Sequence, residues 1–156
     1  MLKQRVLVAA VLLPIGLVAI YLGGVAFTAV VALLLGLAGW EYAQLFHSGG
    51  YRPASALLVA GVLLIVAGRW WDGFESAPWI ITLLVLASMT VHLVTYERGR
   101  DQAGSDFAVT LSGMLYIGWL GAYLVSVRSL PEGMWCCLLY TSDAADDSKR
   151  GERAGG

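Results

Sequence analysis

Two charged side chains, Arg5 and Glu41, are the residues of this sequence best placed to bind an anionic group. Each stands at the end of a long apolar run. A guanidinium binds phosphate oxygens in a fixed geometry, so Arg5 could contact an anionic lipid headgroup while Glu41 positions it. The alternative is an interfacial ion pair with no ligand. That alternative is favoured, because charged side chains at the ends of membrane helices commonly extend to the interface.

The elements that must bring these residues together are two apolar segments joined by a Gly23-Gly24 turn. The first covers residues 6–22 and the second covers residues 25–45. A bilayer core needs about 20 mostly apolar residues per helix, with about 17 as the lower limit. Counted from the turn at ~1.5 Å per residue, Arg5 and Glu41 both lie about 26 Å away. The sequence therefore predicts a helical hairpin that holds the two charges at one depth.

The composition extends this prediction to the whole chain. Of the 156 residues, 58% are hydrophobic and 13% are charged, and the mean hydropathy is +0.72. An average soluble domain has roughly 25% charged residues. The sequence predicts an all-α, polytopic integral membrane helix bundle with about five transmembrane helices, at residues 6–22, 25–45, 54–68, 79–94 and 107–127. The net charge of −1 and the lack of a basic stripe give no indication of nucleic-acid binding, and none is expected.

The orientation of the bundle follows from basic residues in short loops, which collect on the cytoplasmic side. Five basic residues lie on one side of the membrane: Lys3, Arg5, Arg52, Arg98 and Arg100. Two lie on the other side, Arg69 and Arg128. We expect a multi-pass protein of the inner (plasma) membrane with a cytoplasmic N-terminus and an outward-facing loop at 69–78. No Asp, Glu, Lys or Arg lies deep inside a predicted span, which argues against a self-contained pump or channel.

Other conspicuous side chains have simpler interpretations. His92 lies near the end of the fourth predicted span, where a single histidine is more often interfacial than a ligand. Trp70 and Trp71 could form a ligand platform, but anchoring at headgroup level is the favoured role. The small-residue pairs Ala32/Gly36 and Gly118/Ala122 have the spacing that lets helices approach closely. Packing within the bundle is preferred for them, and a homodimer stays open.

The end of the chain has a different character. Residues 137–147 resemble translated sequencing adaptor, and the residues after them resemble further read-through. We therefore divide the chain into a membrane-spanning part, 1–135, and a disordered, non-native tail, 136–156. The tail contains apparent sites that are assigned no function: an acidic cluster of Asp143, Asp146 and Asp147, and a basic triplet of Ser148, Lys149 and Arg150. Cys136 and Cys137 are adjacent, so they can form neither a disulfide framework nor a zinc site.

The front of the chain resembles a known family. The residues that carry the resemblance are MLKQRVLVAAVLLPIGLVAIYLGG and GLAGWEYAQLFHSGGYRP, with a basic start, Pro14 in the first span, a Gly-Gly turn and Trp40-Glu41-Tyr42 closing the second span. This combination is similar to the N-terminus of bacterial phosphatidate cytidylyltransferase, also called CDP-diacylglycerol synthase. The resemblance is good over residues 1–53 and is compatible in hydropathy and loop placement over 54–135.

The resemblance implies an integral-membrane nucleotidyltransferase of phospholipid biosynthesis. Such an enzyme converts CTP and phosphatidate to CDP-diacylglycerol and pyrophosphate, with Mg2+ expected because phosphoryl transfer needs a divalent ion and carboxylates to hold it. The family carries those carboxylates in a C-terminal half with a Gly-His-Gly-Gly…Asp-Arg…Asp signature, which this sequence lacks. We therefore predict no catalytic residue, no metal ligand and no bound Mg2+ in this chain, and an inactive N-terminal fragment. Within it, Arg5 and Glu41 are the candidate substrate-binding residues.

A second hypothesis comes from a different class of protein. The chain could be a small non-enzymatic five-span scaffold or accessory subunit, which explains the missing motifs without truncation. The source DNA separates the two. A reading frame that continues past residue 136 into the missing signature favours the enzyme, and a natural stop there favours the scaffold.

Overall fold

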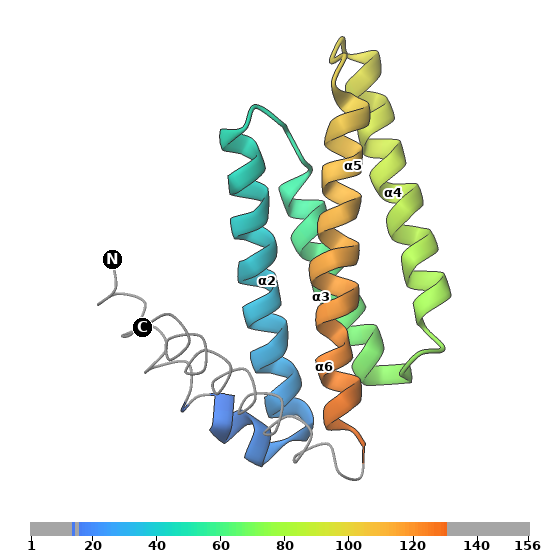
Figure 1. Cartoon of the computed structure of the whole chain (residues 1–156). Coiled ribbons are helices and arrows are strands. Elements are labelled where there is room, and N and C mark those ends of the chain that lie inside the picture. The colour runs from blue at the N-terminus through green and yellow to red at the C-terminus, as the bar shows by residue number, and fades with distance from the viewer. Residues whose placement is uncertain (1–13, 15, 131–156) are drawn as a thin grey trace, which may run out of the picture. The chain divides into compact units, whose positions relative to one another are not determined.

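The chain folds into α-helices in a computed structural model that describes Pro14 and residues 16–130 (Figure 1). Residues 16–22 are helical. The elements that follow are α2 (Gly24–Ser48), α3 (Ser55–Asp72), α4 (Ala77–Glu97), α5 (Ala103–Gly113), a π-helical segment η1 (Met114–Trp119) and α6 (Leu120–Arg128). Between the first short helix and α2, the backbone breaks at Gly23 and Gly24, whose φ angles are +62° and +51°. Glycine tolerates this left-handed region, so the predicted break is confirmed.

Four helices in the described part are long and apolar enough to cross a membrane. They cover Gly24–Ser48, Ser55–Asp72, Ala77–Glu97 and Ala103–Arg128. The predicted all-α membrane bundle is therefore confirmed, and four of its five predicted spans are found. Most of the first predicted span, at 6–22, lies outside the described residues, as do Arg5 and the tail at 136–156.

Two of the predicted span boundaries are wrong in a way that changes the interpretation of charged residues. The helix predicted at 107–127 begins earlier, at Ala103, so Asp106 belongs to its first turn and not to a loop. The helix predicted at 54–68 continues to Asp72, so Arg69 lies inside it. A boundary at the first charged residue is wrong in both places, because a helix can carry a charge on its protein-facing side.

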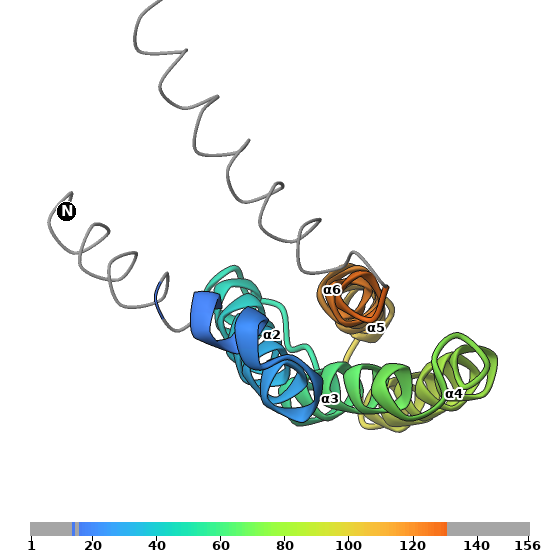
Figure 2. The ribbon, with the colours of Figure 1, turned by 90° about the horizontal axis from the view of Figure 1, so that it is seen from below.

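The chain divides into two compact units, with boundaries at Phe27/Thr28 and at Ser126/Val127. The larger unit, residues 28–126, has its core along α3. Buried residues of α3 recur at helical spacing, at Leu58, Val62, Ile65 and Val66, as expected for a helix covered along one stripe. Seen end-on, α2, α3 and α4 stand in a row, and α5, η1 and α6 pack against it (Figure 2).

Small residues allow the continuous helix of α5, η1 and α6 to approach its neighbours closely. A Cβ atom at Gly113 would lie 2.7 Å from Leu58 Cδ1 and 2.8 Å from Tyr42 Cε1, and one at Gly118 would lie 3.2 Å from the main-chain Cα of Val62. Gly118 and Ala122 are both buried. The packing role predicted for this pair is confirmed.

Candidate functional site at the Asp106 end of the bundle

The carboxylate of Asp106 is fully buried, at 0% exposure, in the first turn of α5. It accepts a hydrogen bond from the main-chain N–H of Arg52 at 2.7 Å. The Arg100 guanidinium donates two more, from Nε to Oδ2 and from Nη2 to Oδ1, the latter at 3.3 Å. A buried charge is tolerated only when it is paired and hydrogen-bonded. Asp106 meets this condition, and both of its oxygens are occupied.

Arg100 joins two segments that are distant in the sequence. Besides the ion pair with Asp106, its Nη2 lies 3.4 Å from the carbonyl oxygen of Gly50 and donates to it. The pKa of Arg100 lies above its usual value, because the hydrogen bond to Asp106 stabilises the charged guanidinium. This side chain is therefore a permanent cation that connects the turn at 98–102 to the loop at 49–54.

Thr110 extends the network one helical turn further into the bundle. Its hydroxyl donates to the main-chain oxygen of Asp106 at 2.8 Å and accepts the N–H of Ala54 at 3.1 Å. It also lies 3.3 Å from His92 Nε2. The Ala54 N–H stands at the start of helix α3, and the first N–H groups of a helix have no partner within that helix. Thr110 supplies that partner from another helix.

His92 is the second buried titratable side chain of the cluster. It is 4% exposed, and its Nδ1 donates to the main-chain oxygen of Ser88 at 2.8 Å. Its ring stands edge-on to Phe107, with 6.0 Å between centroids. The depth of His92 in the membrane stays a prediction; what the sequence did not predict is that α5 covers the ring that α4 carries. Helix pairing, which the single sequence does not show, accounts for this burial.

Tyr42 attaches α2 to the same end of the bundle. Its hydroxyl lies 2.8 Å from Ser112 Oγ and donates to the main-chain oxygen of Val109 at 3.3 Å. Its neighbour Glu41 is exposed, and no ion pair of Glu41 is found within the described residues. The Arg5–Glu41 pair and their substrate-binding role stay predictions, because Arg5 lies outside that part of the chain.

The chemistry of this cluster is structural. Its donors and acceptors bind one another, and both oxygens of Asp106 accept hydrogen bonds. Across Pro14 and residues 16–130, no group of three or more His, Cys, Asp or Glu side chains could hold a metal. The residues described do not fit a Mg2+ site.

The opposite end of the unit at 28–126 carries a second buried charge, Arg69. Its guanidinium carbon lies 3.8 Å from the ring centroid of Phe74, 4.6 Å from that of Trp119 and 5.0 Å from that of Tyr123. Its two terminal nitrogens are buried and have no hydrogen-bond partner in the described part of the chain. Aromatic faces attract a guanidinium electrostatically, so they compensate in part for lost hydration. Neighbouring Trp70 and Trp71 are exposed, in keeping with anchoring at headgroup level.

Comparison with known proteins decides the family. The model of the cytidylyltransferase family matches residues 3–142, which is most of the chain. The chain belongs to the cytidylyltransferase family. A phosphatidate cytidylyltransferase from Pseudomonas aeruginosa is 30% identical over 154 residues, which cover 94% of this chain and 55% of that protein. The chain thus spans about half the length of this curated relative. No solved structure matches this chain.

In this cytidylyltransferase-family chain, the cluster of Asp106, Arg100, Thr110 and His92 was not predicted from the sequence. A signal for part of it was present. Ala103, Asp106, Thr110 and Gly113 are spaced by three or four residues, which places them on one face of a helix, and all four are buried. The apolar run begins only at Phe107, so the first two of these residues lie outside it.

Proposed function

We propose that this chain is the membrane-embedded front part of a phosphatidate cytidylyltransferase. The whole enzyme would transfer the cytidylyl group of CTP to phosphatidate: a lipid phosphate oxygen attacks the α-phosphorus of CTP, CDP-diacylglycerol forms and pyrophosphate leaves. The match of the cytidylyltransferase family model to residues 3–142 carries this proposal. The name of the Pseudomonas aeruginosa relative supports the choice of CTP and phosphatidate as substrates.

The part played by this chain is positional. Four apolar helices hold it in the membrane, and the Asp106 network ties the loop at 49–54 to the turn at 98–102. Buried, fully paired polar groups of this kind rigidify the segments they join. Such a rigid polar end would support the catalytic residues and the Mg2+ of the full-length enzyme, which we place in the part of the protein that this sequence lacks.

The proposed location is the inner membrane, with the N-terminus and the Asp106 end in the cytoplasm. The excess of basic residues at that end supports this orientation, and CTP is a cytoplasmic substrate in this proposal. A homodimer is included in the proposal, and nucleic acid is not among the expected partners. The second candidate, a five-span scaffold without chemistry, rests on the absence of the catalytic signature from the sequence.

A chimera tests the proposal. Residues 1–135 replace the matching part of the Pseudomonas aeruginosa relative, and conversion of radiolabelled CTP to CDP-diacylglycerol is measured in membranes. We expect activity within about tenfold of the parent, and Asp106→Ala in the chimera to lower the amount of folded enzyme. A chimera that inserts and folds but converts no CTP would contradict the proposal and favour the scaffold. The purified 156-residue chain alone should convert no phosphatidate.

A further inference from the structure

A groove lies between the end of α4 and the start of α5. Its volume is about 390 Å3, within the range of roughly 300–1,000 Å3 usual for small-molecule pockets. One wall is a stripe of α4 at helical spacing, formed by Met89, Leu93 and Tyr96. The other wall is the first turns of α5, at Gly104 and Phe107.

The walls of the groove are apolar and lie within two membrane-spanning helices. Met89 is 57% exposed and Leu93 is 54% exposed. A Cβ atom added at Gly104 would meet nothing within 4 Å, so the space in front of this residue is open. His92 lines the groove as well, but its two nitrogens are already directed at Ser88 and Thr110. The space is therefore suited to a hydrocarbon chain from the surrounding bilayer.

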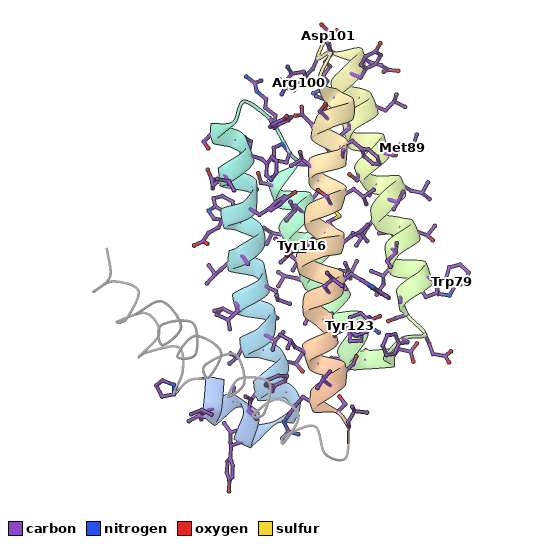
Figure 3. The ribbon with its side chains drawn as sticks, viewed as in Figure 1. Trp79, Met89, Arg100, Asp101, Tyr116 and Tyr123 are labelled. Carbon is purple, nitrogen blue, oxygen red and sulfur yellow. The ribbon has the colours of Figure 1, made fainter. Side chains whose placement is uncertain are left out.

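The polar rim of the groove has a defined charge pattern. Asp101 is the only carboxylate among the residues that line it, and this carboxylate forms no ion pair within the described residues. Figure 3 shows Asp101 and Arg100 at the same end of the bundle, beyond Met89 on α4. Arg98 and Arg100 flank Asp101 in the sequence of this turn. An acceptor for a cation thus stands at the rim. Arg98, in the same short turn, is exposed, whereas Arg100 is paired with Asp106.

We propose that this groove binds one acyl chain of a zwitterionic aminophospholipid, with Asp101 accepting hydrogen bonds from the lipid ammonium group. A carboxylate attracts an ammonium group and repels an anionic headgroup that has no ammonium. Arg98 would face the phosphodiester, because the Arg100 guanidinium is bound to Asp106 and to the Gly50 carbonyl oxygen. This lipid differs from the substrate in the proposed function, which carries a phosphomonoester and no amine. The groove shares the His92 ring with the Asp106 network, and the Asp106 carboxylate is not among its lining residues.

Competition between lipids tests the site directly. The purified 156-residue chain is mixed with equal amounts of phosphatidylethanolamine, phosphatidylglycerol and phosphatidate of one acyl composition, and retained lipids are counted by native mass spectrometry. We expect phosphatidylethanolamine to exceed each of the others by about five-fold. Equal retention, or preference for either anionic lipid, would overturn the proposal.

Two substitutions on one helix locate the lipid. Gly104→Leu fills the open space and should lower phosphatidylethanolamine retention by about five-fold. Ala108→Leu adds a larger side chain to an exposed position of α5 outside the groove, and it should leave retention unchanged. Asp101→Asn should retain lipid but lose the preference for the amine headgroup. Equal retention by the Gly104→Leu and Ala108→Leu variants would contradict the assignment.

A second measurement keeps the test independent of variant folding. Phosphatidylethanolamine with a photoreactive group near the end of one acyl chain is crosslinked to the unmodified chain, and labelled peptides are sequenced. Labels should concentrate on α4 and α5 at Met89, Leu93 and Phe107. Labelling spread over exposed residues of α2, or a crosslink between two copies of the chain through these residues, would overturn the proposal.

Discussion

The carboxylate of Asp106 and the main-chain N–H of Arg52 are joined by a 2.7 Å hydrogen bond across 54 residues of sequence. This bond, with the Arg100 ion pair, closes the polar end of the bundle over a loop that has no regular structure of its own. Asp106→Asn keeps the volume of the side chain but removes its charge. We expect the free energy of unfolding to fall by about 1.5–3 kcal/mol, the usual contribution of a hydrogen bond to a charged group.

Asp101→Asn is the matched control for stability. Asp101 stands five residues earlier and is exposed, so its removal should change the free energy of unfolding by less than about 0.5 kcal/mol. Denaturation in mixed micelles, followed by circular dichroism, measures both variants. Equal losses in the two would show that Asp106 contributes no more than a surface charge.

Thr110→Val tests the hydroxyl that joins α5 to the start of α3. Valine has nearly the same shape, but it leaves the buried Ala54 N–H without its 3.1 Å acceptor. We expect a loss of about 1–3 kcal/mol in the free energy of unfolding. Thr90→Val is the control, because the Thr90 hydroxyl is exposed and only bonds the Leu86 oxygen of its own helix. A loss at Thr90 as large as at Thr110 would refute the role of the interhelical bond.

Gly113→Ala tests the close approach of α5 to its neighbours. The new Cβ would lie 2.7 Å from Leu58 Cδ1 and 2.8 Å from Tyr42 Cε1, so one of these core side chains must move. Overpacking of this kind costs about 1–3 kcal/mol. Gly104→Ala on the same helix meets open space and should be neutral or stabilising by up to about 1 kcal/mol. The unfolding temperature of Gly113→Ala should therefore fall, and that of Gly104→Ala should stay unchanged or rise.

Arg69→Met addresses the buried guanidinium whose terminal nitrogens have no partner in the described part of the chain. Replacing a buried charge by an apolar side chain of similar length is often neutral or stabilising, here by an expected 0 to about 2 kcal/mol. Phe74→Ala should instead destabilise the chain, because it removes the aromatic face at 3.8 Å while the charge stays. The free energies of unfolding of the two variants, measured against the unmodified chain, test both expectations. A strongly destabilised Arg69→Met variant would indicate a partner outside Pro14 and residues 16–130.

Membrane orientation is tested by labelling single cysteines in intact cells, after Cys136 and Cys137 are replaced by serine. Glu75 and Gln102 are exposed residues of the two opposite turns. Cysteine at position 75 should react with an impermeant maleimide, and cysteine at position 102 should react only after the cells are opened. The reverse pattern would invert the proposed topology.

Much of the architecture was predictable from the sequence, because burial in a bilayer depends on local properties. A helix that crosses a membrane satisfies its own backbone hydrogen bonds and needs a long apolar run, both of which can be read along the chain. The helices α2, α3 and α4 and the break at Gly23 and Gly24 followed from such runs. The family resemblance likewise rested on the order of residues near the start of the chain.

The polar cluster depended on tertiary structure. Whether Asp106 faces lipid, water or protein is decided by the residues that meet it, and these come from positions 52 and 100 through a loop and a turn. His92 is buried because α5 passes over it, and Arg69 is buried because Trp119 and Tyr123 reach it from η1 and α6. Hydropathy along the sequence determined which segments form membrane helices. The pairing of those helices, which depends on contacts between residues distant in sequence, decided which charges they enclose.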